Sequence, residues 1–195
     1  MGSFLFYKLL FYTSQNPETR AFWLEWGEKE LFNNPKELEN MLTVFFTLKD
    51  SNFQQSVLFT LFISNANVQH FPLRKFLILF KDSKSNLRLL FRKSPQRLNG
   101  VLSKVFQVMQ IKKDEVELPL ILSFMKKLES AEIRIMDLNS IAKLSYSILK
   151  QRGLAFQDET EIVYAYFLLQ KGILTTSDAE LIYSKKASKY FNRKS

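Results

Sequence analysis

The sequence predicts an all-α protein of about nine to eleven helices that stack as antiparallel hairpins. Three observations lead to this fold class. The chain of 195 residues holds 19 Phe but only 5 Gly and 5 Pro, which leaves little material for turns and β-hairpins. Helix-start signals recur along the chain, and the segments between them carry apolar residues at three- and four-residue spacing. Stacked hairpins of this kind form either an α-solenoid-like array or an irregular helical bundle.

Helix starts are indicated by a capping side chain that is followed by a proline or, three residues later, by a glutamate. The cap accepts a hydrogen bond from a free backbone N–H, and a proline at the first helical position has no N–H to lose. A glutamate three residues after the cap approximates a capping box. Proline follows the cap at Asn16, Asn34 and Ser94, and glutamate follows it at Asn34, Asp158 and Ser177. These signals predict helix after helix.

The expected helices follow one another in chain order. Apolar stripes at helical spacing lie within residues 22–31, 38–46, 53–62, 73–80, 98–109, 120–128, 138–148 and 162–169, and a last helix begins at Leu181. Pro119 is expected to open or kink the helix that follows it, and Gly153 to end the helix before it. Neighbouring stripes would pair as units over residues 35–65, 72–110, 118–150 and 158–192, a length found in α-solenoid repeats.

We expect residues 1–195 to form a single helical domain with two special ends. Residues 1–15 contain one Lys, no acidic residue and many Phe, Tyr and Leu residues. They are either a first helix packed on the body or an amphipathic helix for targeting or for a membrane surface. Residues 185–195 form a basic C-terminal tail. The chain has no Cys, which excludes a disulfide scaffold, a cysteine nucleophile and thiolate metal sites.

The net charge of +9 is distributed unevenly along the chain. Residues 71–113, which we call the basic block, carry 11 basic and 1 acidic side chains, and residues 181–195 carry 5 basic side chains and no acid. Residues 1–70 carry 5 basic and 7 acidic side chains, and residues 114–180 carry 7 and 11. The protein therefore combines one basic block and one basic tail with a mildly acidic body.

The basic block and the tail predict contact with a polyanion, with phosphate as the obvious anion. Arg88 and Arg92 are four residues apart, so on a helix their like charges repel unless an anion lies between them. Neutralised phosphates release counterions, and Arg and Lys bind the backbone rather than read bases. The expected nucleic-acid-binding residues are Arg74, Lys75, Lys81, Lys84, Arg88, Arg92, Lys93, Arg97, Lys104, Lys185, Lys186 and Lys189. The alternative is a solvated surface, or one paired with acidic neighbours such as Glu25, Glu28 and Glu30.

The residues that could carry catalysis or bind a metal do not form a recognisable constellation. His70 is the only histidine and lies beside an expected helix start, without a second histidine for a metal site. The glycines are isolated, so neither a P-loop nor a dinucleotide fingerprint is present. The acidic residues in 114–117 and 158–161 are expected in first helical turns, where the helix dipole favours negative charge. We therefore expect no enzyme, no catalytic or metal-binding residue, no cofactor and no small-molecule substrate.

One segment resembles a known family. Residues Met136–Lys150, MDLNSIAKLSYSILK, are similar to a unit of the organellar helical-repeat proteins, the RAP-domain, FASTK-like and heptatricopeptide-type group. Units of that group often read D-L-x-x-I-A-x-L-x-x-A-L-x-K. The segment departs from this pattern at Ser145–Tyr146, where small residues are usual, and no RAP domain is recognisable at the C-terminus. The resemblance implies stacked helical hairpins that bind organellar RNA, including within mitochondrial ribosomes.

These observations lead to two hypotheses of function. The first is a non-catalytic, RNA-contacting structural component of a ribonucleoprotein, such as a mitochondrial ribosome subunit that contacts ribosomal RNA and neighbouring proteins. Its expected location is mitochondrial, or otherwise cytoplasmic. The second is a helical scaffold or accessory subunit of a large protein complex, including one at a membrane. In that case the Phe-rich N-terminal helix, Trp23 and Trp26 would be the anchors.

Overall fold

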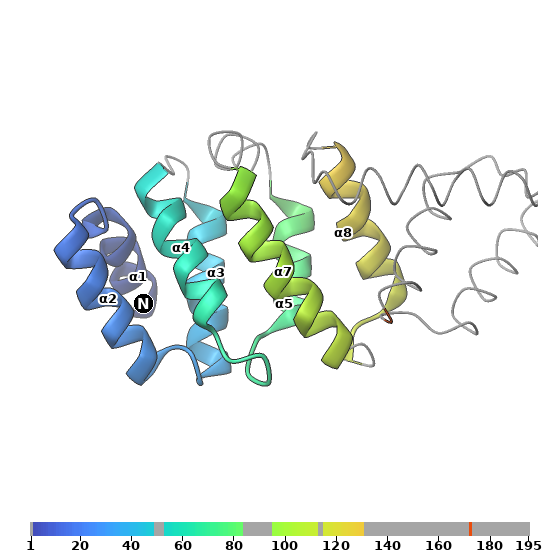
Figure 1. Ribbon diagram of the computed structural model, residues 1–195, viewed down its shortest axis with the longest axis horizontal. Helices are drawn as coiled ribbons and strands as arrows, with labels where there is room; N and C mark the ends of the chain where they lie inside the picture. Colours follow the sequence, from blue (N-terminus) through green and yellow to red (C-terminus); the bar gives the residue numbers. More distant parts are fainter. Residues whose placement is uncertain (1, 49–52, 84–94, 113–114, 131–171, 173–195) are drawn as a thin grey trace, which may run out of the picture. The chain divides into compact units, whose positions relative to one another are not determined.

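A computed structural model describes residues 2–48, 53–83, 95–112, 115–130 and 172 (Figure 1). The chain divides into two compact units, Met1–Ile133 and Arg134–Ser195, and every helix described below belongs to the first. The segment that resembles the organellar repeat proteins, the unit expected at 158–192 and the basic tail lie outside the described residues. The single-domain expectation and the predicted helix count therefore stay predictions.

The all-α prediction is confirmed for the part of the chain that the structure describes. Of these residues 80% are helical, and they form seven helices and no strand. The helices are α1 (Gly2–Thr13), α2 (Pro17–Glu30), α3 (Pro35–Thr47), α4 (Phe53–Asn65), α5 (Leu73–Asp82), α7 (Pro95–Ile111) and α8 (Leu118–Ser130). Among the described helices, none combines the length and the apolar character needed to cross a membrane.

Several predicted helix starts are found where the capping signals lie. The Asn16 side chain accepts a hydrogen bond of 2.9 Å from the backbone N–H of Glu18 at the start of α2. At α3 the Asn34 side chain accepts one of 3.2 Å from the N–H of Glu37. Pro95 is the first residue of α7, and Pro119 is the second residue of α8, so Pro119 opens its helix rather than kinking it. Local capping chemistry thus sets the helix starts.

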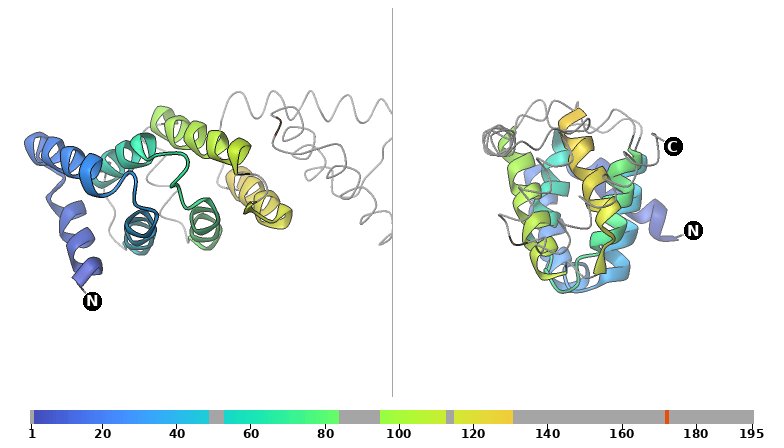
Figure 2. Two further views of the ribbon diagram at one scale, coloured as in Figure 1. Left: turned by 90° about the horizontal axis from the view of Figure 1, so that it is seen from below. Right: turned by 90° about the vertical axis from the view of Figure 1, so that its right-hand side faces the viewer.

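The helices of the first unit contact one another in two rows. In one row α1 packs on α3, α3 on α5 and α5 on α8, and in the other α2 packs on α4 and α4 on α7. Contacts of α1 with α2 and α4, and of α5 with α7, join the rows. Figure 2 (left) shows α2, α4 and α7 on one side and α1, α3 and α5 on the other. Each helix therefore packs mainly against the helix two places along the described chain.

Phenylalanine dominates the core of the first unit, both between the rows and within a row. The rings of Phe45 in α3 and Phe59 in α4 stack with their centroids 3.7 Å apart. Further along, Phe80 in α5 meets Phe124 in α8 at 4.9 Å between centroids, and Phe76 and Phe80 are both fully buried. Aromatic pairs of this geometry add stabilisation beyond the area that they bury. Most of the described Phe side chains thus serve packing, with the exceptions on α1 and α2 that are described next.

Candidate functional site

Helix α1 is apolar on two opposite faces. Its inner face consists of Tyr7, Leu10 and Phe11, all fully buried. On the other side Leu5, Leu9 and Tyr12 are 66%, 59% and 44% exposed. These three residues are spaced by four and then three positions, so they form one line along the helix, which we call the outer stripe. A helix that is apolar all round is normally covered on both sides, and here one side faces solvent.

The inner face holds α1 firmly on α3. The rings of Phe11 and Phe45 have centroids 5.3 Å apart, and the Tyr7 hydroxyl donates a hydrogen bond of 2.6 Å to Oε2 of Glu37. Burial raises the pKa of Tyr7, and the bond to the Glu37 carboxylate raises it further. The phenol thus stays neutral and keeps its hydrogen bond. The outer stripe is therefore presented by a helix with a fixed position on its neighbour.

An aromatic seam joins α1 to α2 and enlarges the exposed apolar area. Phe6 lies 5.6 Å from Trp23 and 5.2 Å from Trp26 between ring centroids, and the Trp23 indole N–H donates a hydrogen bond of 3.0 Å to the Thr13 hydroxyl. Phe22 is 59% exposed and meets the Trp23 ring at 5.1 Å. The exposed large apolar side chains of α1 and α2, which we call the N-terminal apolar surface, are Phe4, Leu5, Phe6, Leu9, Tyr12 and Phe22.

The N-terminal apolar surface is extensive, and its α1 part carries little charge. Because each large side chain offers about 150–250 Å² when fully exposed, the six together expose on the order of 600 Å². The outer stripe, with three of the six side chains, accounts for about half of this area, within the range of about 300–600 Å² for the largest apolar patch on a typical monomer. Lys8 is the only charged residue of α1, and its ammonium lies 6.0 Å from the centroid of the Tyr12 ring. The α1 part of this area thus carries a single cation, while exposed Glu18 and Glu25 lie one turn from Phe22 on α2.

The predicted nucleic-acid-binding residues lie in several places. Arg74, Lys75 and Lys81 are on α5, and Arg97 and Lys104 are on α7. The other predicted residues, Lys84, Arg88, Arg92, Lys93, Lys185, Lys186 and Lys189, lie outside the described part of the chain. The structure therefore brings three of the predicted cations onto one helix, α5.

The cations of α5 are mostly available for an external partner. Arg74 and Lys81 are exposed, and Lys75 is half-buried. Arg74 lies 3.6 Å from Glu117, but both side chains are more than half exposed, and such a pair contributes only about 0–1 kcal/mol. Within the described residues no ion pair joins Lys75 or Lys81 to an acid. The outer side of α5 is therefore a short cationic surface, with Asp82 as its only acid.

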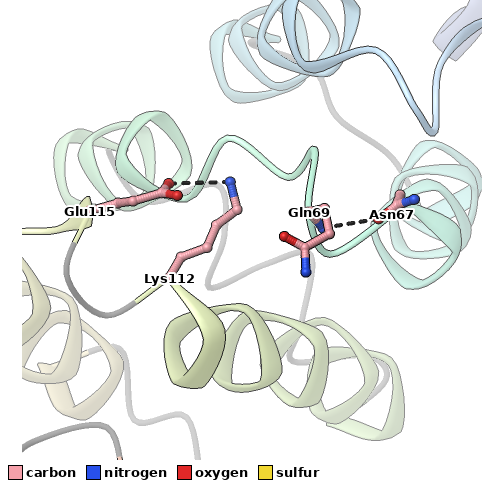
Figure 3. A network of polar contacts seen from close by, with 4 residues as sticks. All are labelled: Asn67, Gln69, Lys112 and Glu115. Atoms are coloured by element: carbon pink, nitrogen blue, oxygen red, sulfur yellow. Dashed lines mark hydrogen bonds and ion pairs between the residues drawn. The ribbon is translucent and has the colours of Figure 1, made fainter.

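Two other cations of the basic block have different surroundings. Lys112 is nearly buried and pairs with Glu115, with its ammonium 3.2 Å from a carboxylate oxygen (Figure 3). Lys104 lines an open groove of about 730 Å³ between α2, α4 and α7, together with Glu25 and Glu28. Partial burial lowers the pKa of Lys104. Lys112 thus fits the alternative expectation, in which basic residues pair with acidic neighbours within the chain, whereas Lys104 only lines a groove with acidic residues.

Several polar side chains that line this groove already form hydrogen bonds within the protein. Glu25 accepts a hydrogen bond of 2.7 Å from Lys29, and this contact lowers the pKa of Glu25 and raises that of Lys29. Asn67, which also lines the groove, accepts a hydrogen bond from the backbone N–H of Gln69 (Figure 3). Its side-chain amide donates to the Asn33 side chain at 2.9 Å. Most of the polar groups described here therefore bind one another, and the groove carries no evident ligand chemistry.

Residues suited to metal binding do not gather in the part of the chain that the structure describes. No group of three or more His, Asp or Glu side chains is placed there to hold a metal ion. His70 is exposed in the turn before α5, where its backbone N–H donates to the Asn67 carbonyl at 3.1 Å. This is the helix-flanking position that the sequence indicates.

The sequence predicts the Phe-rich N-terminal helix as a candidate anchor but does not show which of its side chains are exposed. Phe22 lies in the apolar stripe of residues 22–31, yet its side chain is largely exposed. The signal was present in α1, where Leu9, Leu10 and Phe11 are consecutive and so point to both sides of a helix. No polar face is left for solvent.

No protein-family model, no curated protein and no solved structure was found to match the chain. The resemblance of Met136–Lys150 to the organellar helical-repeat proteins therefore stays a prediction.

Proposed function

We propose that the protein is a non-catalytic helical scaffold, an accessory subunit that binds a neighbouring protein of a large assembly through its N-terminal apolar surface. The observation that carries this proposal is the outer stripe of α1, three large apolar side chains in solvent on a helix that is fixed from behind. An exposed apolar area of this size is typical of an interaction site.

The arrangement of the helices supports a scaffold role. Each described helix packs mainly on the helix two places along, which is how stacked hairpins build an α-solenoid-like array. A helix of such an array needs a polar outer face wherever no neighbour covers it. Because the outer stripe of α1 is apolar, we propose that a neighbouring protein covers it.

A second candidate function has its own observation. The cationic surface of α5, with Arg74, Lys75 and Lys81, suits the phosphates of RNA, as in a structural component of a ribonucleoprotein such as a mitochondrial ribosome. It is placed second because Lys112 pairs with Glu115 and Lys104 lines one groove with Glu25 and Glu28, whereas none of the described helices covers the outer stripe of α1.

Affinity purification of the full chain from cells tests the two proposals together. We expect co-purifying proteins to remain through nuclease treatment and high salt, because apolar contacts depend on neither. The double variant Leu5→Glu/Leu9→Glu should lose these proteins while keeping its helical circular dichroism. The matched control is Ser103→Glu/Gln107→Glu, which adds the same charge at the same spacing to exposed positions of α7.

A different purification result would contradict the scaffold proposal. Partners that leave with nuclease, and that remain bound to the Leu5→Glu/Leu9→Glu variant, would replace the scaffold by the RNA-contacting function.

A further inference from the structure

The row of helices that begins with α1 has a repeating contact. In that row α3 packs between α1 and α5, and α5 packs between α3 and α8. Helix α1 has one such neighbour among the described helices, yet its two faces have the same apolar spacing. The inner face uses Tyr7 and Phe11, four positions apart, and the outer stripe uses Leu5 and Leu9, also four apart. The outer stripe thus has the same four-residue apolar spacing as the face by which α1 packs on the next helix of this row.

We infer that the outer stripe binds one amphipathic α-helix of a partner protein, and this inference rests on the proposed scaffold function. The bound helix would extend the row beyond α1. The shape of the exposed area supports a helix. Leu5, Leu9 and Tyr12 lie at positions i, i+4 and i+7, the anchor pattern of helix recognition. The 12 residues of α1 span about 18 Å, which corresponds to three turns of a docked helix.

The charge at the edge of the stripe specifies the partner further. Lys8 is exposed beside Tyr12, and α1 has no acidic residue. A partner helix that covers the stripe brings apolar residues at three- and four-residue spacing and an acidic residue opposite Lys8. Such a pair at the rim contributes more to orientation than to affinity.

The same charge disfavours the two other occupants. In a symmetric dimer the stripe meets its own copy, so two α1 helices with one Lys each and no acid would face one another. An anionic membrane surface is held by several basic residues, each worth about 1 kcal/mol, and α1 offers one. A helix from another protein can place an acidic residue opposite Lys8, and it needs no further basic residues on α1.

Site-specific photocrosslinking in the full chain tests the inference. A photoreactive phenylalanine replaces Leu5, Leu9 or Tyr12, one at a time, in cells. We expect the three adducts to map to a single segment of one partner protein, at sites three or four residues apart and in an order that follows α1. The control position is Gln107, an exposed residue of α7, which should not label that segment.

Other outcomes overturn the inference. Adducts to a second copy of this chain, adducts to lipid, adducts scattered over a partner, or no adduct at all each exclude a single docked helix. The purification of the Leu5→Glu/Leu9→Glu variant separates this failure from failure of the scaffold proposal. If partners are lost in that variant while adducts are scattered, the scaffold stands and the helix is excluded, and if partners are retained, both fall.

A synthetic peptide of the labelled segment then tests the charge. We expect it to bind the full chain as a helix and to bind the Lys8→Glu variant several-fold more weakly, with Lys36→Glu as the control. Equal affinity for both variants would exclude an acidic residue opposite Lys8.

Discussion

At the scale of single residues, Glu37 serves two helices. Its backbone N–H is bound by the Asn34 cap, as the sequence predicts. In a full capping box its carboxylate would reach back to the N–H of Asn34, but that N–H donates to the Leu31 carbonyl at 2.9 Å. The carboxylate instead accepts the Tyr7 hydroxyl from α1. The local motif was predictable, whereas its tertiary partner was not, because nothing in the local sequence links positions 7 and 37.

Replacing Tyr7 by Phe tests this hydrogen bond. We expect Tyr7→Phe to lower the free energy of unfolding by about 1.5–3 kcal/mol at pH 8, the range for hydrogen bonds to charged groups. Chemical denaturation of the wild type and the variant measures the difference.

The difference in stability between the wild type and Tyr7→Phe should also depend on pH. The pKa of Tyr7 is raised in the folded state above its ordinary value of 10.0, so above pH 10 the unfolded chain releases a proton that the folded chain keeps. This contribution to stability is complete below pH 10 and falls as the pH rises. The stability gap between wild type and Tyr7→Phe should therefore shrink between pH 8 and pH 11. A constant gap would show that Tyr7 ionises alike in both states.

At the scale of helices, two glycines have opposite surroundings. A Cβ on Gly27 of α2 would lie 3.0 Å from the ring of Phe32 and 3.3 Å from that of Phe62, both buried. A Cβ on Gly100 of α7 would meet only ordinary contacts, 3.8 Å from the Ser64 hydroxyl and 4.0 Å from Thr60. Gly27 therefore permits a close approach of the α2 backbone to two aromatic rings, and Gly100 has no such role.

Alanine at each position separates packing from helix propensity. Both changes gain about 0.8–1 kcal/mol from propensity, but overpacking at Gly27 costs about 1–3 kcal/mol. We expect Gly100→Ala to have a higher melting temperature than the wild type. Gly27→Ala should melt several degrees below Gly100→Ala. Equal melting temperatures would mean that Phe32 and Phe62 move aside freely.

The helices themselves were largely predictable, and their neighbours were not. The caps at Asn16 and Asn34 and the prolines at 95 and 119 set the starts through contacts within one turn. Which face of α1 would remain uncovered depends on where distant segments pack. Spacing alone could not decide between core and surface for Leu5 and Leu9.

At the scale of the first unit, the apolar and the cationic surfaces lie on different helices of the same row. Apolar residues gather on α1, with Phe22 of α2 beside them, whereas Arg74, Lys75 and Lys81 lie on α5. The sequence predicted the basic block from charge counts. It could not show that Lys104 would line a groove with Glu25 and Glu28 of α2, because that arrangement arises only on folding. The two surfaces can be tested independently.

A single charge reversal on α5 tests the second candidate function. We expect Lys81→Glu to weaken binding of a single-stranded RNA and to reduce the slope of log K against log salt by about 1. Lys36→Glu is the matched control, since Lys36 is also an exposed lysine of a helix and its reversal changes the net charge equally. Filter binding across a salt series measures both. Equal effects of the two variants would indicate non-specific attraction by net charge alone.

The aromatic seam has a practical consequence for all of these experiments. The chain has only two tryptophans, and both have rings within 6 Å of Phe6, at the edge of the N-terminal apolar surface. Trp23 is hydrogen-bonded to α1, so its emission depends on how α1 sits and on how much water reaches the seam. The unmodified protein thus carries an optical reporter at the place where a partner is proposed to dock, and its fluorescence follows that one end of the molecule without a label.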